Sequence, residues 1–299
     1  MEKNLPQTTF FDHWNFKTFP KSYFLHSKVD HHNNFGYRGD DFKEFEENKK
    51  YLITIGDSWT FCSGIFREVD TWPYLLSKKL NCDNYFNLAI GGRSIDYVSR
   101  ALHLFFNIYK PKGKIYLASI FPSTLRTEFF TNNGTYVSNI RNISGLPELG
   151  SIGKLVSLTA YKNVFKNAYT NVDKFLRNYL LIEYLCKHYN IEFVWTNWYM
   201  FFRTAINEDS KINNFYYDFC YSNQYFLDMY SYFKSINVEF EYISKEDKHP
   251  NHNMQPLMAD AFLKFFNKEL IGKPDLKNIE FSNYNTECEY RCGYENTLY

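Results

Sequence analysis

Short apolar segments alternate with longer segments of helical periodicity through most of this chain, and that alternation limits the possible folds more than any other feature of the sequence. The short segments are rich in β-branched and aromatic residues, which is typical of strands. In the longer segments, apolar residues recur three or four positions apart, which places them on one face of a helix. The expected strands are residues 51–55, 85–89, 114–119, 191–196 and 238–242, and the expected helices are residues 72–80, 94–109, 171–188 and 254–270.

Strands that alternate with helices form a parallel sheet with helices on both faces. We therefore expect an α/β domain over residues 51–270. Two stretches inside it, residues 121–166 and 198–235, are too long for ordinary connections and are expected as insertions after the third and fourth strands. Residues 1–50 are expected to pack on this domain as an N-terminal extension, and residues 271–299 are expected as a polar tail.

The overall composition argues against several classes of function. The 34 basic and 33 acidic side chains give a formal net charge of +1, which is no electrostatic footprint for nucleic acid. No apolar run approaches the roughly 18 residues that span a bilayer, and the polar first residues do not read as a signal peptide. The six cysteines lack a framework spacing, which favours a reducing compartment such as the cytoplasm. Since no His or Cys cluster has the spacing of metal ligands, we expect no metal.

The first expected strand ends abruptly in Gly56-Asp57-Ser58. A serine that a tight turn delivers at the end of a buried strand is expected at the surface of a rigid scaffold, where a nucleophile has to be. Backbone N–H groups of the segment that follows can then face a developing negative charge. Taken alone, the same tripeptide also fits an ordinary structural turn, so the other residues at this edge of the sheet decide its meaning.

Chemistry-bearing residues follow other expected strands as well, and the carboxyl ends of parallel strands meet at one edge of the sheet. A serine hydroxyl needs a base to take its proton and a third group to orient that base. His249 is the candidate base and Asp247 its orienting partner, although an Asp-x-His sequence before a helix also fits a solvated turn. After the second strand, Gly92 can aim its N–H at a ligand as an oxyanion donor, or simply make a tight strand-to-helix turn.

Three motifs, in this order, resemble those of the SGNH (GDSL-type) hydrolases: Gly56-Asp57-Ser58, Asn87-x-Ala89-x-x-Gly92-x-Ser94 and Asp247-x-His249-Pro250. The whole run from Gly56 to Gly92, preceded by Asn34-x-Gly36-Tyr-Arg38, looks like a bacterial and viral branch of that family. The resemblance implies a flavodoxin-like three-layer α/β/α sandwich with a five-stranded parallel sheet. It also implies ester hydrolysis through an acyl-enzyme, without a cofactor.

The same resemblance assigns roles to particular residues. It implies that Ser58 is the nucleophile and that its own backbone N–H and that of Gly92 form the oxyanion hole. It makes His249 the base and Asp247 its orienter, with Glu246 as a fallback orienter because many members place the acid three residues before the histidine.

One departure from the family pattern lies after the third strand. The family usually has Gly-x-Asn-Asp there, and the Asn side chain completes the oxyanion hole. This chain has Ala118-Ser-Ile-Phe-Pro-Ser-Thr-Leu-Arg126 instead, with no Asn. Ser119, Ser123 and Arg126 are candidate substitutes, with Asp57 as a further support, and the sequence does not choose among them. Loss of one oxyanion donor lowers a rate by roughly 10²–10³. We therefore expect a site that catalyses slowly, that uses a different oxyanion donor, or that is no longer active.

Three functions are compatible with these residues. The first is a serine esterase that removes an acyl group, in particular acetyl, from carbohydrate. The second is a weakly active or inactive scaffold that serves as a structural or glycan-binding protein, for example in a virion. The third is an O-acyltransferase that passes the acyl group to a sugar hydroxyl. The expected partner is a small acyl ester or an acylated glycan, with no nucleic acid and no membrane, and the oligomeric state is left open.

Overall fold

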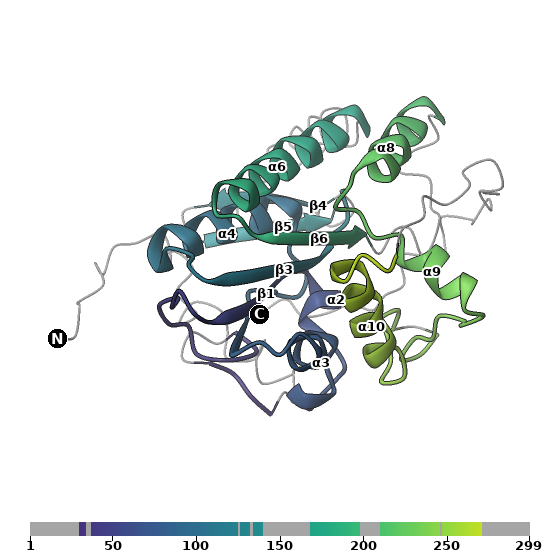
Figure 1. Cartoon of the computed structure of the whole chain (residues 1–299). Helices are drawn as coiled ribbons and strands as arrows, with labels where there is room; N and C mark the ends of the chain where they lie inside the picture. The colour runs from purple at the N-terminus through teal and green to yellow at the C-terminus, as the bar shows by residue number, and fades with distance from the viewer. Residues whose placement is uncertain are drawn as a thin grey trace.

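A parallel sheet forms the centre of the computed structural model, which describes residues 30–33, 37–124, 126–131, 134–139, 168–197, 210–245 and 247–270 (Figure 1). The strands of this sheet lie in the order β2 (Asn84–Asn87), β1 (Lys50–Gly56), β3 (Lys114–Phe121) and β6 (Glu192–Asn197). Numbered along the chain, this is the order 2-1-3-4 of a flavodoxin-like doubly wound sheet. The predicted α/β fold class is therefore confirmed.

Helices cover both faces of this sheet, as Figure 1 shows. On one face α4 (Ile95–Tyr109) packs against α6 (Ala168–His188), and on the other α3 (Trp72–Lys79) packs against α10 (Met254–Phe266). A buried apolar cluster fills each interface between sheet and helices, and alternate strand residues point into opposite clusters, as the strand period requires. These four helices and the four strands were all predicted, within a few residues of their observed ends.

Shorter elements surround this framework. They are α2 (Ser58–Phe61), the 3-10 turn η1 (Glu68–Asp70), α8 (Ser210–Ser222), α9 (Met229–Ser235) and an antiparallel hairpin of β4 (Arg126–Thr131) and β5 (Gly134–Asn139). The hairpin begins five residues after the end of β3, inside the segment that was expected to break the α/β alternation.

Within the described residues the parallel sheet has four strands, and the fifth strand expected from the sequence is not among them. Residues 238–242 form no strand, and Tyr242 makes only an isolated antiparallel bridge with Pro250. Phe226 instead makes an isolated parallel bridge with Trp195 of β6, at the edge of the sheet. The alternating apolar residues of 238–242 pack against the buried cluster between the sheet and helices α3 and α10, where the Phe240 ring stacks on Trp59 of α2 at 5.5 Å between centroids. The prediction of a strand over residues 238–242 is therefore wrong.

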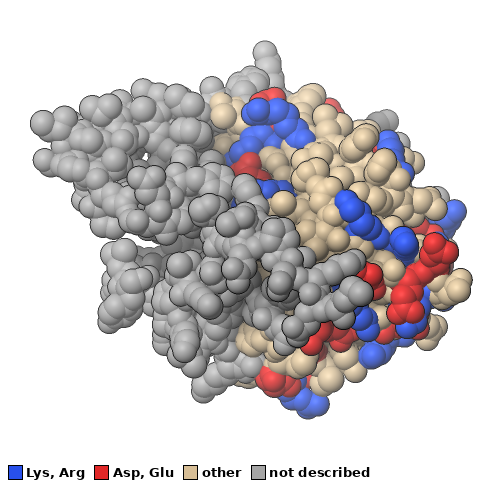
Figure 2. Space-filling view, turned by 90° about the vertical axis from the view of Figure 1, so that its left-hand side faces the viewer, with Lys and Arg blue, Asp and Glu red and all other residues tan. Residues whose placement is uncertain are grey.

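Charged side chains of both signs are interspersed over the described part of the face shown in Figure 2. This distribution is in line with the formal net charge of +1. Among the described helices, none has both the length and the apolar content needed to cross a membrane.

Candidate active site

Ser58 is the first residue of α2 and lies directly beyond the end of the central strand β1. The turn between them needs glycine, since a Cβ atom on Gly56 would lie 2.3 Å from Thr60 Oγ1 and 2.5 Å from the Ile120 carbonyl oxygen. Asp57 caps the helix, and its Oδ1 accepts a hydrogen bond from the Trp59 N–H at 3.0 Å. The strand end, the glycine and the cap together fix the position of Ser58.

Burial of Ser58 contradicts the expectation of an exposed serine. Its relative exposure is 4%, because the whole of α2 is buried at the edge of the sheet. Within the described residues, no protein acceptor is recorded for the Ser58 amide N–H, which belongs to the first turn of the helix where such groups lack intrahelical partners. That amide is therefore available to a ligand oxygen.

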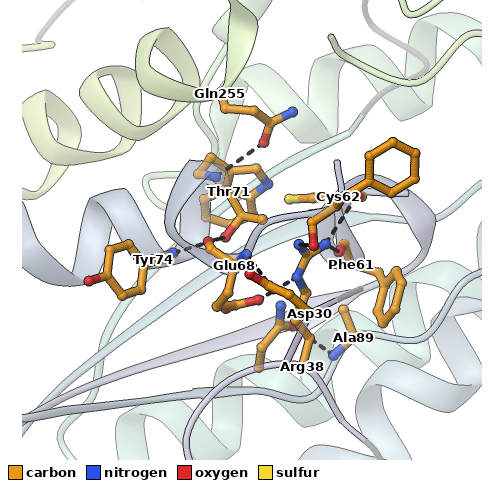
Figure 3. A network of polar contacts seen from close by, with 12 residues as sticks. Asp30, Arg38, Phe61, Cys62, Glu68, Thr71, Tyr74, Ala89 and Gln255 are labelled. Atoms are coloured by element: carbon orange, nitrogen blue, oxygen red, sulfur yellow. Dashed lines mark hydrogen bonds and ion pairs between the residues drawn. The ribbon is translucent and has the colours of Figure 1, made fainter. Parts of the chain in front are cut away.

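Arg38 holds the opposite end of α2 (Figure 3). Its side chain is fully buried, and Nη1 donates to the carbonyl oxygens of Phe61 at 3.1 Å and Cys62 at 3.2 Å, while Nη2 donates to that of Phe66 at 3.3 Å. Arg38 Nε forms an ion pair with Glu68. A buried cation thus satisfies the carbonyl groups at the carboxyl end of the helix that carries Ser58.

The sequence motif that ends in Arg38 did not predict that its side chain would bind the carbonyl groups at the end of α2. Asn34 and Gly36 of the same motif lie outside the described residues.

Burial raises the pKa of the Glu68 carboxyl to about 7, although the charge of Arg38 and its hydrogen bond act in the opposite direction. The Glu68 N–H donates to Asp30 Oδ1 at 2.9 Å, which anchors η1 to the N-terminal segment.

The loop after β2 runs beside the end of β1. The Ile90 N–H donates to the Gly56 carbonyl at 3.3 Å, and Asn87 Nδ2 donates to the Thr60 carbonyl at 3.4 Å, which ties this loop to α2. Gly92 has φ +77°, a left-handed conformation that favours glycine. In the described part of the chain, no protein acceptor is recorded for its amide N–H either. Gly92 thus lies in a loop that is tied to α2 and to the end of β1.

His249 and Asp247 are paired in the loop before α10. His249 Nδ1 and Asp247 Oδ1 are 2.5 Å apart, and the same oxygen accepts from the His249 backbone N–H at 3.1 Å. Partial burial raises the pKa of the Asp247 carboxyl, but the hydrogen bonds and charge of His249 outweigh it and leave that pKa below its usual value. The carboxylate thus stays ionised, as an orienting group must.

This His-Asp loop packs against the chain that leaves α2. A Cβ atom on Gly64 would lie 2.1 Å from Ile243 Cδ1 and 3.9 Å from Asp247 Oδ2. No hydrogen bond between Ser58 Oγ and His249 is recorded among the described residues. Catalytic hydrogen bonds of this kind often tighten only when substrate binds. The loop that carries the His-Asp pair therefore contacts the segment that follows Ser58 and α2, at Gly64.

The candidate substitutes for the family's asparagine differ in their surroundings. The Ser119 hydroxyl donates to the Ile55 carbonyl inside the sheet, and Ser123 is buried with its carbonyl accepting from the Arg126 N–H at 3.1 Å. Arg126 Nη1 donates to Asp57 Oδ2 at 2.5 Å. Arg126 is therefore the candidate that directly contacts the residue before Ser58. Glu246, the fallback orienter, lies outside the described residues.

Two other kinds of reactive group are relevant among the described residues, a cysteine beside α2 and metal-binding side chains. Burial raises the pKa of the Cys62 thiol to about 12, so this cysteine beside α2 is not a thiolate at neutral pH. The described residues contain no group of three or more His, Cys, Asp or Glu side chains placed to hold a metal ion.

Comparisons with known proteins give structural likenesses only. No protein-family model matches the sequence, and no curated protein matches it. Similar solved structures include a member of the lipolytic G-D-S-L family from Veillonella parvula, with 13% identity, a TM-score of 0.42, and coverage of 73% of this chain and 99% of that chain. The esterase EstA from Pseudoalteromonas has 14% identity and a TM-score of 0.42, covering 74% and 99%. A variant of an acetyl-xylooligosaccharide esterase from a Geobacillus has 15% identity and a TM-score of 0.36, covering 74% and 95%.

Proposed function

We propose that this protein is a serine esterase that cleaves an acyl ester through an acyl-enzyme on Ser58. The observation that carries the proposal is the 2.5 Å contact between His249 Nδ1 and Asp247 Oδ1, in a loop packed against the segment that follows Ser58. A histidine held in this way keeps its Nε2 free to accept a proton, which is the arrangement a serine hydroxyl needs.

The proposed reaction assigns one step to each group. Ser58 Oγ attacks the ester carbonyl carbon while His249 Nε2 takes its proton, and Asp247 stabilises the resulting imidazolium. The amide N–H groups of Ser58 and Gly92 donate to the oxyanion of the tetrahedral intermediate. His249 then protonates the leaving alcohol, and water, activated by the same histidine, releases the acid from Ser58.

For the ester we propose an acetyl group on a carbohydrate, because such esters are common substrates in the family that the three motifs resemble. Peracetylated sugars and 4-nitrophenyl acetate are suitable first substrates because both carry a small acyl group. Release of acetate into water identifies a hydrolase, whereas acetylation of an added acceptor sugar identifies an O-acyltransferase. Binding of the acetylated sugar without turnover identifies an inactive, glycan-binding scaffold.

Single substitutions test the assigned roles. Ser58→Ala and His249→Ala are expected to abolish acetate release in proteins that retain the wild-type circular dichroism spectrum. His103→Ala is the matched control, because His103 is exposed on α4, and it is expected to leave the rate unchanged. Turnover by the Ser58→Ala variant at the wild-type rate would rule out the proposed function.

A further inference from the structure

Arg126 joins the two loops that carry the proposed oxyanion donors. Its Nη1 donates to Asp57 Oδ2 at 2.5 Å and to the Arg93 carbonyl at 3.3 Å. Asp57 immediately precedes Ser58, and Arg93 immediately follows Gly92. One guanidinium nitrogen thus links the neighbours of both amide groups.

The link is built from buried, well-anchored groups. The Asp57 side chain is fully buried and that of Arg126 is 15% exposed. Both carboxylate oxygens of Asp57 are engaged, Oδ1 with the Trp59 N–H and Oδ2 with Arg126. A buried ion pair whose acceptors are occupied has one preferred geometry, and breaking it leaves an uncompensated charge.

The backbone of Arg126 is fixed from two sides. Its N–H donates to the Ser123 carbonyl at 3.1 Å, within the turn that leaves β3, and its carbonyl accepts from Lys174 Nζ of α6 at 2.6 Å. The backbone that carries the guanidinium is therefore held by the turn after β3 and by α6. That rigidity suits a residue that sets the distance between two others.

We propose that Arg126 is the positioning residue of the oxyanion hole, and that it acts through Asp57 and the Arg93 carbonyl in place of a direct donor from the end of the third strand. The proposal rests on the proposed esterase function. Ser58 begins α2 and Gly92 lies in the loop after β2, and their amides converge on one oxygen only if these two segments keep their spacing. Because a displacement of about 1 Å in a catalytic group lowers a rate by about 10²-fold, loss of the link is expected to lower kcat with little effect on KM.

The test compares Arg126→Gln, Asp57→Asn and the double variant on a chromogenic acetate ester. Asparagine keeps the cap on α2, since its side-chain oxygen also accepts from a helix N–H. Each single variant is expected to lower kcat about 10- to 100-fold with KM within about twofold, and the double variant is expected to be no slower than the slower single one. Arg126→Lys is expected to recover part of kcat, because an ammonium group can still donate to Asp57.

A readout that does not need activity accompanies the kinetics. Hydrogen–deuterium exchange in peptides covering residues 88–94 is expected to accelerate in Arg126→Gln. Lys114→Gln is the matched control, because it removes an ion pair with Glu192 at the opposite end of β3, and it is expected to change neither kcat nor exchange at residues 88–94.

Three outcomes would overturn the proposal. The first is a wild-type kcat per folded molecule in Arg126→Gln. The second is a multiplicative loss in the double variant, which would make Arg126 a direct donor to the oxyanion. The third is unchanged exchange at residues 88–94 in Arg126→Gln. If the wild-type protein itself shows no turnover, the proposed esterase function fails, and the exchange experiment still decides whether Arg126 joins the two loops.

Discussion

Replacement of Arg38 by methionine tests whether a buried cation holds the helix that carries Ser58. Methionine has a similar length and is apolar, so the substitution removes charge and donors while leaving most of the volume filled. Three carbonyl oxygens, those of Phe61, Cys62 and Phe66, lose a donor, and Glu68 loses its ion-pair partner.

The expected size of the effect follows from these contacts. Removing one partner of a buried ion pair destabilises a protein by about 3–5 kcal/mol, and a buried acceptor left without a donor adds about 1 kcal/mol or more. Part of the loss is relieved because solvent or relaxed backbone satisfies some of the carbonyls, so we expect about 4 kcal/mol for Arg38→Met. That is a large share of the roughly 5–15 kcal/mol that keeps a typical domain folded.

Urea unfolding at pH 8 is the assay, since Glu68 of the wild type, with a pKa of about 7 beside Arg38, is then mostly ionised. The double variant Arg38→Met/Glu68→Gln is expected to regain about 1–2 kcal/mol over Arg38→Met, because the unpaired buried carboxyl group is gone while the Phe61 carbonyl still lacks the guanidinium donor. The carbonyls of Cys62 and Phe66 keep backbone donors, the N–H groups of Ile65 and Asp30. Lys49→Met, which breaks the exposed pair with Glu46, is the control and is expected to lose less than about 1 kcal/mol. A loss below about 1 kcal/mol in Arg38→Met, or no recovery in the double variant, would refute the reasoning.

Three further predictions follow from the same contacts. Gly56→Ala is expected to destabilise the protein by about 1–3 kcal/mol or more in urea unfolding and to lower esterase activity, because the new Cβ meets Thr60 Oγ1 at 2.3 Å and the Ile120 carbonyl at 2.5 Å. Because the folded state raises the pKa of Glu68 to about 7, it binds the proton more tightly than the unfolded state does. The stability of the wild type relative to Glu68→Gln is therefore expected to fall by at most about 3 kcal/mol as pH rises from about 4.5 to 7. A difference in unfolding free energy that stays flat across that range would contradict this prediction. Asp247→Asn is expected to lower kcat by about 10²–10⁴ without loss of folding, since the amide no longer holds His249 in the required tautomer, and an unchanged pH–rate profile would count against this role.

The fold was predictable because its signals are local. The apolar stripe of α4 and the β-branched run of β1 each reflect burial that repeats within one element. The strand expected at residues 238–242 shows where such local signals fail. Phe240 is shielded from water by stacking on Trp59, a residue far away in the sequence, and not by pairing within a strand. A period-2 pattern records that side chains are buried, not what they are buried against.

The candidate site was predictable in its parts but not in its links. Ser58, Gly92 and the His249–Asp247 pair each carry a short motif. The order of the parallel strands places Ser58 and Gly92 at one edge of the sheet, whereas the His249–Asp247 pair follows no strand and lies near the chain that leaves α2 through the contact of its loop with Gly64. The contact of Arg126 with Asp57 spans 69 positions and has no motif of its own. The expectation of an exposed Ser58 was wrong because the whole of α2 is buried, which a strand-end motif does not reveal.

The central claim is that Ser58 is an activated nucleophile. The direct measurement is labelling of the folded protein by a fluorophosphonate, with the modified residue located by mass spectrometry and Ser58→Ala as the control. The account predicts one adduct, on Ser58, which forms in the wild type and is absent from Ser58→Ala. A folded wild-type protein that takes up no label, or that is labelled elsewhere and equally in Ser58→Ala, would contradict it.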